Sequence, residues 1–280
     1  MIKLNSKHSN LAVNTLVYII MAVFFLVYIV PIWYIISTSF KLDADAYTIP
    51  PAIVFYPTLK NYIIAFTSRG IFANFVNSLI ISVSSSAIAM VLGVPAAYAL
   101  SRFDFKAKNG IYNWVLSTRI APPIVAAIPY FVLSRQIGLY DSRLLMSIVY
   151  ILINLSWVIW MMGSNFNDIP RQIDEAALAD GCNRFTAFCR VIIPIAKPGL
   201  AATMVFSLIM AWNEYFFALI LTSVNSKTLP AAITSFQSVQ GLLLGQMCAT
   251  GTVVMLPILI FSMFMQKQLV RGLTMGAVKG

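Results

Sequence analysis

The sequence predicts an all-α integral membrane protein with six transmembrane helices and both termini in the cytoplasm. Hydrophobic residues make up 60% of the 280 residues and charged residues only 10%, whereas a soluble domain carries roughly a quarter charged residues. So little polar surface cannot keep a globule of this size dispersed in water. Long apolar runs and an uneven distribution of basic residues, taken in turn below, give the helix count and the orientation.

Each expected span is a run of about 20 mostly apolar residues, the length that an α-helix needs to cross the bilayer. In chain order the spans are 12–36, 72–99, 110–133, 144–163, 198–221 and 248–266. The first is too long for the apolar core of a signal peptide, and no A-x-A cleavage site follows it, so we expect it to be retained. The third contains Pro122-Pro123, where we expect a kink.

The remaining segments connect these spans. The charge-free stretch between Lys227 and Lys267 is too long for one helix. Because its first half is rich in Ser, Gln and Gly, we expect a re-entrant or outer-surface segment there. The domain organisation is therefore a single polytopic membrane domain over residues 1–280. It comprises a first helix at 12–36, a core at 72–266 that includes a loop at 168–195, and a cytoplasmic tail at 267–280.

Basic residues set the orientation, since cytoplasmic loops retain an excess of Lys and Arg. Six spans put both termini on one side. If that side is the cytoplasm, the inside holds Lys3, Lys7, Arg102, Lys106, Lys108, Arg171, Arg184, Arg190, Lys197, Lys267, Arg271 and Lys279. The outside then holds half as many, namely Lys41, Lys60, Arg69, Arg135, Arg143 and Lys227. The basic residues form no dense stripe with interleaved aromatics, so nucleic-acid binding is not expected.

Composition and motifs also argue against an enzyme. The cysteines, Cys182, Cys189 and Cys248, form no CxxC pair or even disulfide set, and His8 is the single histidine, so we expect no metal site. The sequence contains no phosphate-binding GxxxxGK[ST] loop, no HExxH and no GxSxG, and we expect no bound cofactor. A stand-alone carrier or channel remains an alternative, although the sequence shows no convincing internal repeat.

The loop that follows the fourth span is the largest on the cytoplasmic side. Residues 164–197 contain four acidic and four basic side chains, so this segment faces water. We expect Asp168 or Asp174 to cap a short helix that ends at Gly181. A second amphipathic turn should place Phe185 and Phe188 on one face. Two prolines, Pro194 and Pro198, bracket the return to the bilayer, so the loop is expected to present a helical hairpin to a soluble partner.

A motif in this loop identifies a family resemblance. Glu175-Ala176-Ala177, then Gly181 after three residues, and Ile193-Pro194 further on resemble the EAA loop of the membrane subunits of bacterial ABC importers. Val191 and Ile193 stand where the pattern usually has Ile and Leu. Matches to the carbohydrate branch are NYIIAF at 61–66, Asn77-Ser78, AAYALSRFDF at 96–105, Pro122-Pro123, AWNEYFFAL at 211–219 and GLTMGAVKG at 272–280. The chain is similar to the second of two unlike permeases in maltose-type systems.

The resemblance implies a type I ABC importer permease fold in the bacterial inner membrane. The implied partners are a second, unlike permease, two ATP-binding subunits that hold ATP and Mg, and an extracytoplasmic sugar-binding protein. The EAA helix would dock on an ATP-binding subunit as a coupling helix, with Glu175 pairing a basic group and Gly181 setting the turn. The implied docking residues are Asp174, Glu175, Ala176, Ala177, Asp180, Gly181, Phe185, Pro194, and Gly276 and Lys279 in the tail.

Two charged residues fall inside expected spans, where they are costly and therefore candidates for function. Arg119 and Glu214 differ in expected depth by about 10 Å, which favours separate roles over direct pairing. Glu214 with Trp212, Asn213 and Tyr215 could line the sugar path, or these residues could join helices or form an interfacial belt. Arg119 could face an anionic sugar, stabilise a gate, or contact a partner. The sequence leaves the sugar open, and also the possibility of a non-sugar solute.

Overall fold

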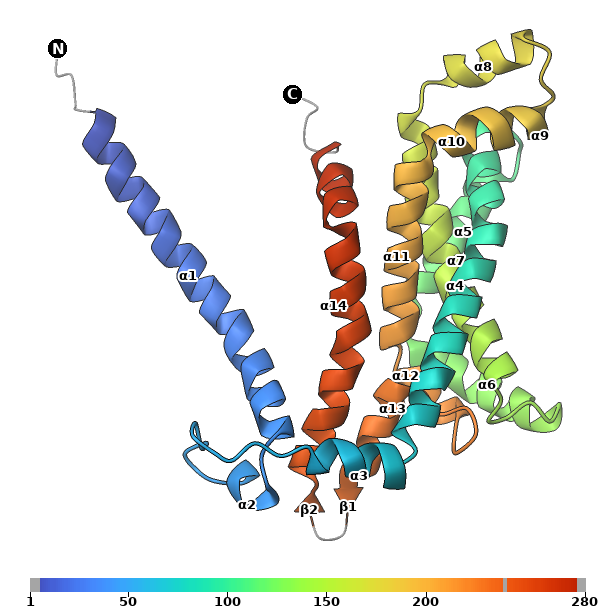
Figure 1. Cartoon of the computed structure of the whole chain (residues 1–280). Coiled ribbons are helices and arrows are strands. Elements are labelled where there is room, and N and C mark those ends of the chain that lie inside the picture. The colour runs from blue at the N-terminus through green and yellow to red at the C-terminus, as the bar shows by residue number, and fades with distance from the viewer. Residues whose placement is uncertain (1–5, 239–240, 276–280) are drawn as a thin grey trace. The chain divides into compact units, whose positions relative to one another are not determined.

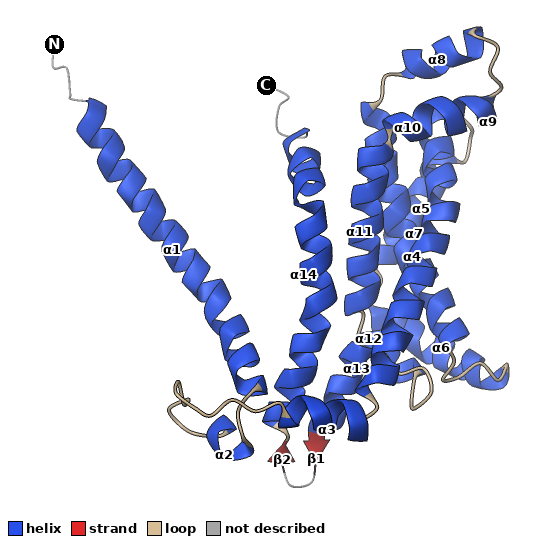
Figure 2. Ribbon diagram, viewed as in Figure 1, coloured by secondary structure: helices blue, strands red, loops and turns tan. Residues whose placement is uncertain are grey.

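The computed structural model describes residues 6–238 and 241–275, and almost all of its regular structure is helical (Figure 1, Figure 2). The helices longer than two turns are α1 Ser6–Ser39, α3 Lys60–Ser68, α4 Ile71–Arg102, α5 Lys108–Ile120, α6 Pro123–Gln136, α7 Arg143–Asp168, α8 Arg171–Ala179, α11 Lys197–Asn213 and α14 Leu244–Met275. The shorter ones are α2 Asp43–Ala46, α9 Arg184–Ala187, η1 Phe188–Ile192, α10 Ile193–Ile195, α12 Phe216–Leu221, α13 Leu229–Ala232 and η2 Ile233–Phe236. Two short strands, β1 Gln237–Ser238 and β2 Gly241–Leu242, pair antiparallel.

Four helices of the described chain are long and apolar enough to cross a membrane unaided. They cover Val13–Ser39, Ile71–Arg102, Arg143–Asp168 and Leu244–Met263. Two sharply bent helix pairs, Lys108–Ile120 with Pro123–Gln136 and Arg184–Ile195 with Lys197–Asn213, raise the number to six if each pair is one span. The prediction of an all-α membrane protein is confirmed, and the four uninterrupted helices overlap the expected first, second, fourth and sixth spans.

The third expected span, 110–133, differs from the single kinked helix that we predicted. Helices α5 and α6 meet at 90°, and Ala121 between them is extended, with ψ of 129°. The cause is Pro122, because the proline ring excludes the residue before it from the α-helical region. Pro123 then starts α6 at a position where a missing N–H costs nothing.

The fifth expected span, 198–221, is also interrupted, which corrects the placement of Glu214 inside a helix. Helix α11 ends at Asn213, Glu214 is extended with ψ of 123°, and α12 begins at Phe216. No glycine or proline marks this break in the sequence. The sixth span begins at Leu244 rather than at 248, and the expected re-entrant or outer-surface segment consists of α13, η2 and the β1–β2 hairpin.

The chain divides into two compact units, and the smaller one combines the described residues up to Arg69 with Phe236–Val253. Its centre is polar. The Asn61 side chain donates to the carbonyl oxygens of Ser39 at 3.0 Å and Lys41 at 2.7 Å. The Lys41 ammonium lies against the rings of Tyr34 and Phe55. These contacts fix the turn at the end of α1 to α3.

The larger unit, Gly70–Ser235 with the chain from Val254 onward, is built around α4, α7 and α11. Helices α4 and α7 approach closely at Gly93, where a Cβ atom would lie 2.7 Å from Val158 Cγ1. One apolar cluster near the α8 end contains Ala97, Tyr98, Met162, Phe166 and Ile192. A second, which α6, α12 and α13 complete, contains Ile81, Met146, Tyr150, Phe217 and Leu221. Figure 1 shows α8 to α10 at one end of this unit and α12 and α13 at the other.

Candidate functional site

Helix α8 contains the motif residues, and its C-terminus is closed by a glycine turn. The Gly181 N–H donates to the Leu178 carbonyl and the Cys182 N–H to the Ala177 carbonyl, both at 3.1 Å. This pair of bonds is the Schellman motif, which needs a left-handed residue at the Gly181 position. The φ of Gly181 is +87°, a conformation that glycine adopts without steric cost. Gly181 therefore sets the turn between α8 and α9.

The N-terminus of α8 differs from our prediction of an Asp168 or Asp174 cap. Pro170 occupies the N-cap position, and no side chain caps the helix. Asp168 is the last residue of α7, and Asp174 lies in the first turn of α8 but turns towards α4. The following helix, α9, does carry a side-chain cap, because the Asn183 side chain accepts from the Thr186 N–H at 2.8 Å.

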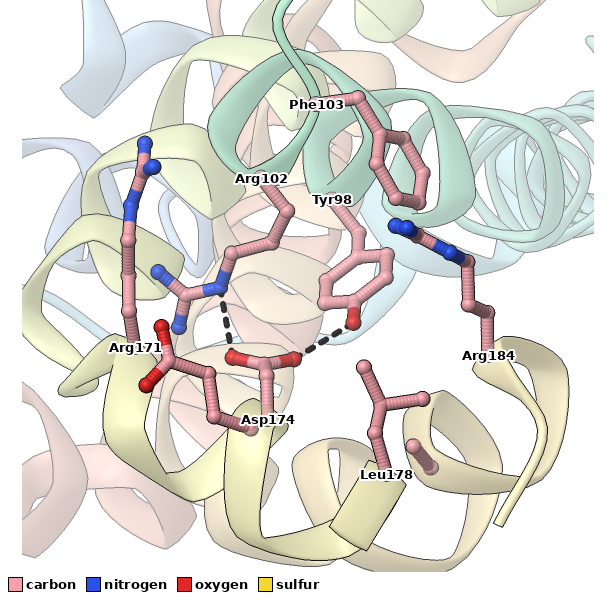
Figure 3. Close-up of a pocket in the computed structure, with 9 residues that line it drawn as sticks. Tyr98, Arg102, Phe103, Arg171, Asp174, Leu178 and Arg184 are labelled. Carbon is pink, nitrogen blue, oxygen red and sulfur yellow. Dashed lines mark hydrogen bonds and ion pairs between the residues drawn. The ribbon is translucent and has the colours of Figure 1, made fainter. Parts of the chain in front are cut away.

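Asp174 joins α8 to the last turn of α4 (Figure 3). Its Oδ2 forms an ion pair with Arg102 Nε at 2.9 Å, and its Oδ1 accepts a hydrogen bond from the Tyr98 hydroxyl at 2.6 Å. Arg102 also donates from Nη2 to the Ile169 carbonyl at 2.8 Å, and Arg171 Nη2 donates to the Ser101 carbonyl at 3.2 Å. Tyr98 and Arg102 share one face of α4 because they are four residues apart.

This contact, which we call the α4–α8 clamp (Tyr98, Arg102, Asp174), is shielded from water. The side chains of Arg102 and Asp174 are only 6% and 14% exposed. Aromatic rings support it, since Tyr98 packs on Phe188 at 4.7 Å and on Phe166 at 5.5 Å between ring centroids. A buried charge that loses its partner is strongly destabilising. The clamp is therefore a fixed connection rather than a loose surface pair.

The neighbouring residues of α8 point outward. Glu175, Ala176 and Asp180 are exposed, while Ala177 is buried at 6% exposure. The two adjacent carboxylates, Asp174 and Glu175, thus differ in exposure, although both line the pocket between α4 and the α8–α9 hairpin.

Beyond the turn, Phe185 is 76% exposed, whereas Phe188 packs on Tyr98. Our expectation that these two rings share one face is wrong, because Phe185 is exposed on α9 while Phe188, at the start of a π-helical turn, packs inward on Tyr98. Pro194 is exposed in α10. Gly276 and Lys279, which we also expected to dock, lie outside the described residues.

A pocket of about 220 Å³ opens between the end of α4 and the α8–α9 hairpin. Figure 3 shows the clamp on one side of it and Arg184, which stacks on Phe103 at 4.9 Å, on the other. The lining consists of Tyr98, Arg102, Phe103, Arg171, Asp174, Glu175, Leu178, Arg184 and Ala187. Within the described part of the chain no group of His, Cys, Asp and Glu could hold a metal ion.

Glu214 has a local role at the break between α11 and α12. Its Oε1 accepts from the Phe217 N–H at 3.0 Å and its Oε2 from the Ala218 N–H at 3.3 Å. A carboxylate at this position satisfies free N–H groups of the first helical turn and is favoured by the helix dipole. Glu214 and Arg119 are both described, and no ion pair joins them.

The neighbours of Glu214 divide into one buried and two exposed residues. Trp212 is 1% exposed, donates to the Val254 carbonyl at 3.1 Å and packs on Phe75. Asn213 and Tyr215 are exposed. Trp212 therefore joins helices. Asn213 donates from Nδ2 to the Ile209 carbonyl at 2.9 Å and remains exposed, and the Tyr215 side chain is exposed as well.

Arg119 lies at the end of α5 with an exposed side chain. Its guanidinium carbon lies 4.8 Å from the ring centre of Trp157 and 5.9 Å from that of Trp160, both on α7. Stacking on aromatic rings stabilises a cation by about 0.5–2 kcal/mol. This contribution offsets part of the free-energy cost of placing Arg119 in a membrane span.

Sequence reasoning missed the most extensive polar contact of the larger unit, at the end opposite to α8. The Asp141 carboxylate accepts four backbone N–H bonds, from Ser223, Val224, Asn225 and Ser226, at 2.9–3.0 Å. The Asn225 and Ser226 side chains donate to it as well. Partial burial raises the pKa of Asp141, but the four backbone donors outweigh burial and hold the pKa well below its usual value. A lone acid gives no sequence signal for such a contact.

The loop that Asp141 holds is also tied to α4. Asn77 Nδ2 donates to the carbonyl oxygens of Asn225 and Lys227, each at 3.0 Å, and Asn77 Oδ1 accepts from Arg143 Nε at 2.7 Å. Ser78 Oγ accepts from the Leu229 N–H at 2.7 Å. The Asn77-Ser78 pair thus fixes the 223–229 segment to the first turns of α4.

With this arrangement established, comparison with known proteins assigns the family. The family model described as binding-protein-dependent transport system inner membrane component matches residues 89–275. The chain belongs to this family. It is therefore a permease, a transport component of the bacterial inner membrane, and the matched region includes α8, its turn and the α4–α8 clamp.

Two relatives agree with this assignment over most of the permease, and a solved structure shares its fold. The inner membrane ABC transporter permease protein YcjP of Escherichia coli is 34% identical, covering 93% of this chain and 94% of its own. The trehalose transport system permease protein SugB of Mycobacterium tuberculosis is 34% identical over 90% of this chain and 93% of its own. A chain in the crystal structure of a bacterial ABC transporter involved in the import of the acidic polysaccharide alginate has a TM-score of 0.74 at 23% identity, covering 95% and 99%.

Proposed function

We propose that this permease is one of the two membrane subunits of an ATP-driven importer for a sugar or sugar derivative. Its partners are a second, unlike permease, two ATP-binding subunits that bind ATP and Mg, and an extracytoplasmic binding protein. Both termini and the α8–α10 loop lie in the cytoplasm. In this assembly α8 docks on an ATP-binding subunit and converts its closure into a change of access to the solute path.

The observation that carries the proposal is the two-sided construction of α8. One side is fixed to α4 through the clamp, while Ala176 and Asp180 are exposed, and Glu175 is exposed although it also lines the pocket beside the clamp. A helix that transmits a rigid-body movement needs a firm inner attachment and a free outer surface. The small Ala176 side chain allows close approach of a partner, and Glu175 offers a charge to a basic side chain.

The solute assignment has separate support. SugB, which is 34% identical over nearly the whole chain, is named for trehalose transport, and the family depends on a binding protein. Within the permease, Asn213 and Tyr215 are exposed beside the α11–α12 break. An amide and an aromatic ring suit hydroxyl groups and pyranose faces. Glu214 and Trp212 support this region from behind, through their contacts with α12 and Val254.

Charge reversal at Glu175 tests the coupling role. We expect Glu175→Lys to abolish uptake and to release the ATP-binding subunits, or uncouple their ATPase, while the permease still inserts at wild-type levels. Asp104→Lys is the matched control, because Asp104 is an exposed acid on the adjacent α4–α5 connection and forms a surface pair with Lys108. Normal uptake by Glu175→Lys, or failure of the wild-type chain to co-purify with any ATP-binding subunit, would contradict the proposal and favour a stand-alone carrier.

The solute is tested on the binding protein that works with this permease. A thermal-shift screen with sugars, anionic sugars and non-sugar solutes such as amino acids should return a stabilising sugar. Uptake of that sugar in cells should then depend on this permease. Stabilisation by a non-sugar solute alone would assign the permease to a different solute while leaving the coupling role of α8 in place.

A further inference from the structure

The α4–α8 clamp separates two acidic residues that are adjacent in the sequence. Asp174 and Glu175 lie in the same turn of α8, yet the Asp174 side chain is 14% exposed and has both oxygens engaged by α4, while Glu175 is exposed. A carboxylate that pairs with the Arg102 guanidinium at 2.9 Å and accepts a hydrogen bond from the Tyr98 hydroxyl at 2.6 Å has little freedom to reach another subunit. The Asp174 carboxylate therefore connects α8 to α4 within the permease.

We propose that Asp174 is a positioning residue that makes α4 the helix through which the movement of α8 enters the membrane domain. This inference rests on the proposed coupling function of α8. Breaking the clamp leaves α8 able to dock but no longer fixed to α4, so the docking step and the access change become disconnected.

Three features of the contact single out α4. First, Arg102 binds α8 twice over, through Asp174 in the helix and through the Ile169 carbonyl in the connection that precedes it. Secondly, Arg171 of α8 donates back to the Ser101 carbonyl of α4. Thirdly, the Tyr98 ring packs on Phe188, so the second arm of the hairpin presses on the same turn of α4. Both arms of the loop therefore converge on Tyr98 to Arg102.

The geometry of the clamp restrains α8 against more than one kind of movement relative to α4. The two carboxylate oxygens of Asp174 meet partners one turn apart on α4, an ion pair with Arg102 and a hydrogen bond from Tyr98. Translation and rotation of α8 relative to α4 therefore both disrupt one of these two contacts. A single contact would allow α8 to pivot. The pair transmits movement in more than one direction, which a coupling element requires.

The test uses the complete importer in proteoliposomes, with ATP hydrolysis and solute uptake measured together. Per folded permease, we expect Asp174→Asn to bind the ATP-binding subunits as wild type does and to hydrolyse ATP at a rate within about two-fold of wild type, although its folded yield falls because Arg102 loses its charged partner. Uptake should fall roughly ten-fold, within the range of coupling between sites, so that more ATP is consumed per solute. Asp168→Asn, an exposed acid at the end of α7, is the matched control and should keep the wild-type ratio.

Loss of the ATP-binding subunits in Asp174→Asn would overturn the inference, because Asp174 would then be a docking contact like Glu175. A wild-type ratio of ATP to solute would overturn it too. Tyr98→Phe keeps the ring packing and removes one hydrogen bond, so it decides the question if Asp174→Asn does not fold. Its ratio should rise several-fold, and an unchanged ratio contradicts the inference. Failure of the wild-type chain to assemble would instead refute the proposed function.

Discussion

Replacing Asp141 by Asn should destabilise the end of the larger unit opposite to α8. Asp141 has φ of 58°, a left-handed conformation that Asn adopts as readily as Asp, so the backbone is not disturbed. The change removes the charge and turns one acceptor oxygen into an NH2 group. Each carboxylate oxygen now accepts three bonds, with Ser223 and Ser226 on Oδ1 and Val224 and Asn225 on Oδ2. The amide of Asn would therefore face three donors in either orientation.

The magnitude follows from those three lost bonds. A hydrogen bond contributes about 1 kcal/mol net to stability, and water at this exposed loop replaces part of what is lost. We therefore expect a loss of roughly 2–3 kcal/mol. For a chain of this size about 1 kcal/mol moves the unfolding temperature by roughly 2–4 °C, which gives an expected decrease of about 5–10 °C.

The assay is thermal unfolding of the detergent-solubilised permease at one scan rate, since membrane proteins commonly unfold irreversibly. Asp104→Asn is the matched control, because Asp104 is exposed and its contact with Lys108 is a surface pair. The control should stay within about 1 °C of wild type, as surface pairs contribute little. An Asp141→Asn variant that unfolds with the control would refute the reasoning that the carboxylate fixes the 223–226 loop.

Three further predictions concern the pH dependence of the Asp141 contact and two glycines. The difference in unfolding temperature between wild type and Asp141→Asn should be constant from pH 7 to pH 5 and narrow below about pH 4. The reason is that a carboxylate with a lowered pKa loses its contribution to stability as the pH falls from its unfolded-state pKa towards its folded-state pKa. A difference that disappears by pH 6 would contradict this. Gly93→Leu should greatly reduce the yield of folded permease in size-exclusion profiles, because even a Cβ at this position would lie 2.7 Å from Val158 Cγ1. The smaller change Gly93→Ala should also reduce the yield, and adding Val158→Ala to it should restore part of the loss. Gly181→Val should destabilise the α8–α9 turn by about 1–2 kcal/mol, the cost of a left-handed β-branched residue, and protease cleavage in the loop should rise; Gly110→Val, with open space around it, is the control.

The number and place of the apolar spans could be predicted from the sequence because a run of about 20 apolar residues in lipid must satisfy its backbone N–H and C=O groups internally, which a helix does. The breaks within the spans were only partly visible. Pro122-Pro123 indicated a kink, but its size depended on how α5 and α6 pack. The break at Glu214 carries no glycine or proline, and a glutamate that accepts from the N–H groups of Phe217 and Ala218 looks in the sequence like any other glutamate in a helix.

The site was predictable to the same limited extent. The motif spacing located α8 and its glycine turn, because a Schellman turn is a local arrangement. The inward direction of Asp174 was not predictable, since it depends on Tyr98 and Arg102, which lie more than 70 residues earlier in the chain. Asp141 and its loop are separated by a similar interval. Long-range polar contacts of this kind leave no periodicity in a single sequence.

Helix α4 connects both of these long-range contacts. Asn77 and Ser78 near its start hold the 223–229 segment that Asp141 organises, and Tyr98 and Arg102 at its end hold α8. The 21 helical steps from Asn77 to Tyr98 span about 32 Å, close to the thickness of the hydrocarbon core. A helix that is bonded at both ends moves as one rigid body. A displacement of α8 must therefore either shift the 223–229 segment or break one of these contacts. Asp141 and Asp174, which bear no sequence relation to each other, therefore secure opposite ends of the same mechanical element.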